Sequence, residues 1–129
     1  MKKLLLDTHT FIWWVSAPEK LSKKVLNLCK DRENTLILSV ASVWEIQIKI
    51  QLGKLKIETE LANLIDEQRQ INDLEILPVL LEHVLILNNL TNYHKDPFDR
   101  LLVAQSQVEN LDIVSKDQLI KKYTVNVIW

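Results

Sequence analysis

Four acidic residues stand where a folded chain could gather them. Asp7 and Asp117 follow short apolar runs typical of buried strands, Glu45 lies in the first turns of a helix after another such run, and Asp99 opens a long helical segment. Carboxylates that crowd together repel one another, so a site that collects several is costly unless a cation neutralises it. Oxygen ligands select Mg²⁺ or Mn²⁺, which can activate water against a phosphodiester. The four acids therefore indicate metal-dependent phosphodiester chemistry.

Each of these acids also has a purely structural interpretation. Asp7 and Asp117 could cap the helices that follow them, and Asp99 could complement the dipole of its own helix. Glu45 stands three residues after Ser42, which matches a capping box. Any one acid is weak support for a site, and the shared position of all four at strand ends is the stronger observation.

The longest expected helix begins just after Asp96. Pro97 suits the first helical position, where its missing N–H is no loss, and the Asp96 carboxylate can accept hydrogen bonds from the free N–H groups of the first turn. An apolar stretch, residues 101–104, follows as a buried helix requires. We therefore interpret Asp96 as a cap beside the site and expect a helix over residues 97–109.

Strand-length apolar runs alternate with helical periodicity along the chain. This alternation predicts an α/β domain with a mainly parallel sheet of four or five strands and helices on both faces. Ligands bind such sheets at the carboxyl ends of the strands, where the four acids are expected. The expected strands are 3–6, 36–38, 74–79, 112–115 and 124–128. The expected helices are 8–15, 22–30, 39 or 42–53, 60–70, 81–90, 97–109 and 117–122.

Length and composition exclude several other classes. The 129 residues fit one domain, and 16 Lys and Arg against 17 Asp and Glu leave no global charge to attract a nucleic acid. The single glycine, Gly53, excludes a P-loop and a dinucleotide-binding fingerprint, and the single cysteine, Cys29, excludes an internal disulfide. We expect Cys29 to be a small core residue. No stretch has the length of a membrane span or signal-peptide core, so we expect a cytoplasmic protein.

Three motifs keep a recognisable order and spacing along the whole chain. They are Leu5-Leu6-Asp7-Thr8-His9, Ser42-Val43-Trp44-Glu45-Ile46 followed by Lys49 and Gly53-Lys54-Leu55, and His94-Lys95-Asp96-Pro97-Phe98-Asp99-Arg100-Leu101-Leu102-Val103-Ala104-Gln105. From Met1 nearly to Trp129, the sequence resembles the PIN-domain nucleases. Within that family it is most similar to the VapC toxins of bacterial toxin–antitoxin pairs.

The resemblance implies a single PIN domain over residues 1–129 and an endoribonuclease that depends on Mg²⁺ or Mn²⁺. It also implies a cognate VapB-like antitoxin as partner and a homodimer. Asp7, Glu45 and Asp99 would be catalytic acids that bind the metal, with Asp117 as a more variable fourth. Thr8 would orient Asp7 or a bound water. Ser115-Lys116 stands before the last acid where the family more often has threonine and a small residue.

RNA binding requires cations besides the metal. Lys49, Lys54 and Arg100 lie near the acids in sequence and are candidates for phosphate contacts. The alternative for each lysine is a solvated helix face, and the alternative for Arg100 is a pair with a neighbouring carboxylate.

Two other functions stay open from the sequence. One is a phosphoryl-transfer enzyme with Asp7 as nucleophile, although Asp7-Thr8-His9-Thr10 lacks the second acid that an aspartate phosphatase would use. The other is a non-catalytic module that keeps the PIN shape to bind a protein partner. The complete set of four acids argues against the second alternative.

Overall fold

Five parallel strands form one sheet in the computed structural model, which describes all 129 residues. Their order across the sheet is β3-β2-β1-β4-β5, so β1 lies at the centre between β2 and β4. The predicted α/β fold with a mainly parallel sheet is confirmed. The strands are β1 (Lys3–Leu6), β2 (Thr35–Ser39), β3 (Glu75–Leu77), β4 (Asp112–Val114) and β5 (Val127–Ile128).

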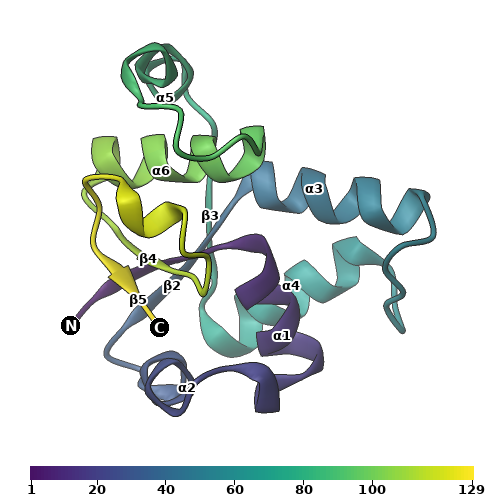
Figure 1. Ribbon diagram of the computed structural model, residues 1–129. Coiled ribbons are helices and arrows are strands. Elements are labelled where there is room, and N and C mark those ends of the chain that lie inside the picture. Colours follow the sequence, from purple (N-terminus) through teal and green to yellow (C-terminus); the bar gives the residue numbers. More distant parts are fainter.

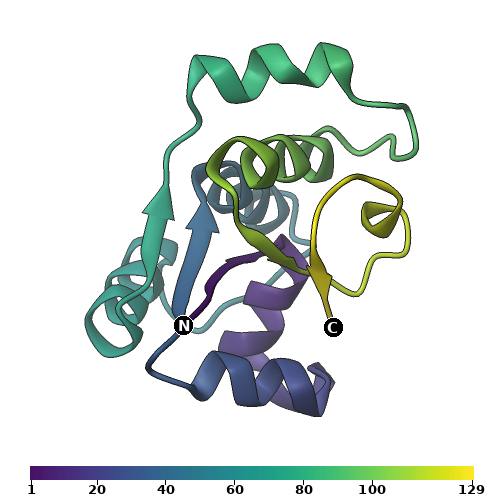
Figure 2. The same ribbon diagram turned by 90° about the vertical axis from the view of Figure 1, so that its left-hand side faces the viewer.

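Helices cover both sides of this sheet. Figures 1 and 2 show α5 stacked outside α6 on one side, with α1, α2 and α4 on the other. Short 3₁₀ turns occupy Pro18–Lys20, Leu87–Asn89 and Ile120–Lys122. No helix has the length and apolar character needed to span a membrane. The helices are α1 (Thr8–Ser16), α2 (Lys23–Lys30), α3 (Val40–Gln51), α4 (Leu61–Asn72), α5 (Leu81–Ile86) and α6 (Pro97–Glu109).

The side chains of β1 alternate between two hydrophobic clusters. Leu4 and Leu6 pack on the side of α1 and α2, whereas Leu5 packs on the side of α6, and all three are fully buried. A parallel strand that is buried on both faces needs such a continuous apolar run. Cys29 is buried in the first cluster as predicted, and burial raises the pKa of its thiol to about 11.

A buried histidine ties the outer helix α5 to α6. His83 is fully buried, and its Nδ1 accepts the N–H of Leu80 at 2.9 Å. Its Nε2 therefore carries the ring proton and donates to the Glu109 carboxylate at 2.8 Å. The contact is a structural bond between the two helices.

The helical prediction for residues 81–90 and 117–122 was too long. The first segment divides into α5 and a 3₁₀ turn, and only Ile120–Lys122 is helical in the second. The strands expected at 74–79 and 124–128 also shorten, to three and two residues respectively. These short elements lie near the edges of the fold, where neighbouring segments rather than local pattern decide how far each element extends.

Candidate metal centre

Asp7 and Ser115 leave the sheet side by side because they follow neighbouring parallel strands. Leu6 of β1 and Val114 of β4 are paired in register. Asp7 is only 5% exposed, and one of its carboxylate oxygens accepts the Thr10 N–H at 2.8 Å. The other oxygen accepts the Ser115 hydroxyl at 2.6 Å. The carboxylate thus caps α1 and at the same time faces the segment after β4.

Glu45 lies within α3 rather than at its start. Ser39 caps this helix by accepting the N–H of Ala41, so of the two predicted starts Ser39 is confirmed, and the alternative interpretation of Ser42 and Glu45 as a capping box was wrong. Glu45 is buried, and its Oε1 accepts the Thr8 hydroxyl at 2.6 Å. Thr8 had been expected to orient Asp7 or a water, and in the structure its hydroxyl contacts Glu45.

Asp99 lies in the first turn of α6, and Asp96 caps that helix as predicted. The Asp96 carboxylate accepts the Phe98 N–H at 2.8 Å. Burial first, and then the nearby carboxylates of Asp96, Asp7 and Glu45, raise the pKa of Asp99 to about 7 against the opposing effect of His94. The Asp99 side chain is 17% exposed. Asp7 and Glu45, from distant parts of the chain, therefore both act on the Asp99 carboxyl group.

Asp117 approaches Asp99 from the turn that follows β4. The Asp117 N–H donates to the Ser115 hydroxyl oxygen at 3.0 Å, and its Oδ1 accepts the Leu119 N–H at 2.7 Å. Burial raises the pKa of Asp117, but hydrogen bonds from His94 and from the Leu119 N–H outweigh this effect and lower the pKa below its usual value. The fourth acid is thus anchored both to its own turn and to His94.

His94 opens the third motif, but its contact with two of the acids was not predicted from the sequence. Its Nε2 lies 2.8 Å from Asp117 Oδ2 and 3.1 Å from Asp99 Oδ2. The three groups lie within 4.8 Å of one another, a spacing that suits a bound ion. The sequence signals were its place in that motif and its position two residues before the cap of α6, whereas its partner Asp117 is 23 residues away.

The predicted RNA-contacting cations have different surroundings. Lys49 Nζ lies 3.4 Å from Glu45 Oε2, one helical turn away. Lys54 is exposed beyond the end of α3, and no ion pair joins it to the acids. Arg100 donates to main-chain carbonyls of the preceding segment and to the Tyr123 hydroxyl. Contact of these three residues with RNA stays a prediction.

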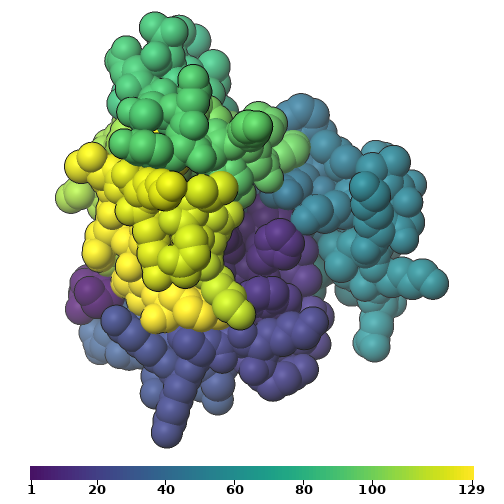
Figure 3. Space-filling model, in the orientation of Figure 1, coloured from purple at the N-terminus to yellow at the C-terminus, as the bar shows by residue number.

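The donor set suits a hard divalent cation. Asp7, Glu45, Asp99 and Asp117 offer only carboxylate oxygens, the ligand type that Mg²⁺ and Mn²⁺ prefer. Besides burial, the carboxylates of Asp96, Asp7 and Glu45 disfavour the charged form of Asp99, and a cation would offset this repulsion. Figure 3 shows a hollow in the surface where α1, α3 and the segment after β4 meet. Asp7 immediately precedes α1, Glu45 lies in α3, and Asp117 lies in the segment after β4.

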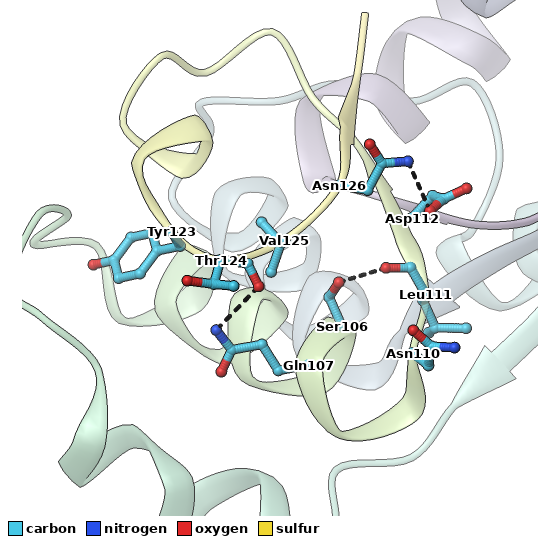
Figure 4. Close-up of a pocket in the computed structure, with 9 residues that line it drawn as sticks. All are labelled: Ser106, Gln107, Asn110, Leu111, Asp112, Tyr123, Thr124, Val125 and Asn126. Carbon is cyan, nitrogen blue, oxygen red and sulfur yellow. Dashed lines mark hydrogen bonds between the residues drawn. The ribbon is translucent and has the colours of Figure 1, made fainter.

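A separate cavity of about 610 Å³ lies at the other end of the strands, near the start of β4 (Figure 4). It includes Asp112, the first residue of β4, whereas the four acids lie beyond the carboxyl ends of the strands or in the helices there. None of the predicted site residues lines it. The lining residues are Ser106, Gln107, Asn110, Leu111, Asp112, Tyr123, Thr124, Val125 and Asn126.

Comparisons with known proteins agree with this architecture. A family profile described as the PIN domain matches residues 4–126. The fold is similar to that of VapBC2 from Rickettsia felis bound to a DNA fragment from its promoter, with 17% identity, 98% of each chain covered and a TM-score of 0.74. No curated protein is a significant match.

Two further solved structures share the fold at low identity. DNA-bound VapBC from Salmonella typhimurium is 16% identical over 99% of this chain and 98% of that one, with a TM-score of 0.68. FitAcB from Neisseria gonorrhoeae is 17% identical over 98% of this chain and 96% of that one, with a TM-score of 0.63. At these identities the likeness is one of fold.

Proposed function

Because the chain belongs to the PIN domain family, we propose that it is a divalent-metal-dependent endoribonuclease and the toxin of a VapBC-like toxin–antitoxin pair. The observation that carries the proposal is the convergence of carboxylates on Asp99: those of Asp96, Asp7 and Glu45 act on its pKa, and that of Asp117 lies within 4.8 Å of it. The acids before α1, within α3 and at the start of α6 influence one carboxyl group. Such crowding is costly in a folded protein and is offset when a cation binds.

Asp7, Glu45, Asp99 and Asp117 are the residues that would hold Mg²⁺ or Mn²⁺. When bound, the ion supplies Lewis-acid stabilisation of the phosphodiester and activation of water. The protein orients the ligands: the Ser115 hydroxyl donates to Asp7, and the Thr8 hydroxyl donates to Glu45. Hydrogen bonds of this kind fix the direction of carboxylate oxygens in metal sites.

Lys49 is the candidate phosphate contact best supported by the geometry. Its side chain is 27% exposed and its ammonium nitrogen lies 3.4 Å from Glu45 Oε2, a position from which it could reach both the site and an RNA phosphate. We extend the proposal to Lys54 and Arg100 as outer contacts. In this role Arg100 would have to bind RNA while its guanidinium also holds the chain segment before α6.

We further propose a VapB-like antitoxin as the partner, a homodimer as the assembly, and residues 1–129 as a single domain. The support is the similarity of the fold to VapBC proteins from two bacteria. A small DNA-binding protein encoded beside this gene is the expected partner. Copurification of the two proteins as one complex checks this, and failure of the neighbouring product to bind argues for a free-standing nuclease.

The activity is tested with purified protein on single-stranded and folded RNA in Mg²⁺, Mn²⁺ or EDTA. We expect cleavage with either ion, none in EDTA, and at least about 100-fold slower cleavage by Asp99→Asn, since a loss of several kcal/mol of charge stabilisation has this effect on rate. Asp66→Asn, on the exposed side of α4, is the matched control.

The same assay separates the alternatives. Equal cleavage in EDTA and in metal would reject the metal role. No cleavage by a protein that still binds its partner would favour the non-catalytic module. A phosphoaspartate trapped at Asp7 would instead favour phosphoryl transfer.

A further inference from the structure

His94 is buried in the site although it lies on the loop before α6. It is 9% exposed, and its Nε2 faces two carboxylates, those of Asp117 at 2.8 Å and Asp99 at 3.1 Å. These two acids belong to different segments, one after β4 and one in α6. The imidazole therefore occupies the place where the two segments meet.

The other ring nitrogen determines what His94 can do there. Nδ1 accepts the N–H of Asp96 at 3.1 Å, so it must present a lone pair. In the neutral ring the proton then resides on Nε2, which donates to Asp117 Oδ2 and lies 3.1 Å from Asp99 Oδ2. A nitrogen that carries this proton donates hydrogen bonds and offers no lone pair to a cation. The spacing of His94, Asp99 and Asp117 suits a metal, but the tautomer makes His94 a donor rather than a ligand.

The main chain of His94 is fixed from two further directions. Its N–H donates to the Tyr123 hydroxyl at 3.0 Å, and its carbonyl accepts from Arg100 Nη1 at 3.4 Å. Arg100 also donates to the Tyr123 hydroxyl at 3.2 Å. The main chain of His94 is thus held by α6 and by the C-terminal segment, independently of any substrate.

We propose that His94 is a positioning residue: its Nε2–H holds the Asp117 carboxylate beside that of Asp99 and so completes the metal-binding set of acids. Asp117 has the most need of such a tie, because its side chain is 31% exposed on a turn. Without the donor, the facing oxygens of the two carboxylates would repel each other. This inference rests on the proposed function only in naming Mg²⁺ or Mn²⁺ as the ion that the four acids bind.

Two substitutions of His94 separate the role of its Nε2 from that of its Nδ1. In His94→Gln the amide nitrogen lies near the place of Nε2 and preserves a donor to Asp117. In His94→Asn the shorter side chain preserves an acceptor for the Asp96 N–H near the place of Nδ1 but leaves no donor in the site. Thermal unfolding of both variants checks that the fold is retained.

The first readout is ¹⁵N NMR of the His94 ring in metal-free wild-type protein. We expect a pyridine-type Nδ1 and a pyrrole-type Nε2. The second readout is the affinity for Mn²⁺ by calorimetry. Loss of an outer partner of a metal ligand typically lowers affinity about 10–100-fold, so we expect this loss in His94→Asn and most of the affinity restored in His94→Gln.

A double-mutant cycle with Asp117→Asn tests the route of the effect. If His94 acts through Asp117, the double variant His94→Asn/Asp117→Asn binds Mn²⁺ no more weakly than Asp117→Asn alone. Additive losses, wild-type affinity in His94→Asn, or a pyridine-type Nε2 would each overturn the inference. Neither readout uses RNA, so absence of RNA cleavage would contradict the proposed function and leave this inference standing.

Discussion

At the scale of single residues, one carboxylate can cap a helix and face a site at the same time. In Asp7, Oδ1 accepts the Thr10 N–H while Oδ2 accepts the Ser115 hydroxyl. In Asp117, Oδ1 accepts the Leu119 N–H while Oδ2 faces His94. From the sequence, capping a helix and facing a site look like alternatives. The spacing of residues predicts only the capping contact, which uses one of the two carboxylate oxygens. The direction of the second oxygen depends on neighbours that the fold supplies.

Asp99 should make the metal-free protein less stable as the pH rises. Its folded pKa of about 7 lies above the ordinary value of 3.8, so between pH 4 and 7 the folded state holds a proton that the unfolded state has lost. Stability therefore falls through this window, by at most about 1.4 kcal/mol per pH unit for one group. Asp99→Asn removes the effect, and its free energy of unfolding should rise relative to wild type between pH 4 and 7.

Urea unfolding in EDTA at the two ends of this window measures the effect. Asp66→Asn, exposed on α4, should follow the wild type within about 0.5 kcal/mol at both values. If Asp99→Asn lost as much stability as a cap deletion at both ends, the residue would belong to the scaffold and not to a crowded acidic site.

At the scale of elements, the long helices follow from the sequence and the short elements do not. The expected helices at 8–15, 22–30 and 97–109 correspond to α1, α2 and α6 within one residue at each end. Caps define them: Ser22 accepts the Val25 N–H, and Asp96 accepts the Phe98 N–H. At 117–122 the Asp117 side chain accepts the Leu119 N–H, yet only a 3₁₀ turn follows, so a cap alone does not make a helix there. The contacts of His94 were not predicted, since its partners come from α6 and from the turn after β4.

Arg100 should act mainly as an anchor for the segment between α5 and α6. Its guanidinium donates to the carbonyls of Leu87, Leu90, Thr91 and His94. Arg100→Met leaves these acceptors without their charged donor, and we expect a loss of about 2–4 kcal/mol in the free energy of unfolding. Urea denaturation measures this loss.

Arg69→Met, on an exposed position of α4, is the control and should change stability by no more than about 0.5 kcal/mol. Unchanged stability of Arg100→Met together with weaker RNA binding would contradict the anchor role and support Arg100 as a phosphate contact.

At the scale of the whole molecule, strand order assembles the site. The central position of β1 places Asp7 between the residues that follow β2 and β4, and α6 brings Asp99 over the same edge. The alternation of strands and helices predicted that acids would gather at the carboxyl ends of a parallel sheet. It could not predict the pairing of β1 with β4, which are more than 100 residues apart and meet only through long-range packing.

Diffraction at the manganese edge from a crystal soaked in Mn²⁺ tests the central claim most directly. The account predicts an anomalous peak in contact with the carboxylates of Asp7 and Asp99, near Glu45 and Asp117, and no peak there in crystals of Asp99→Asn. Well-ordered wild-type crystals with no ion between Asp7 and Asp99, or with these carboxylates directed into separate regions, would contradict it.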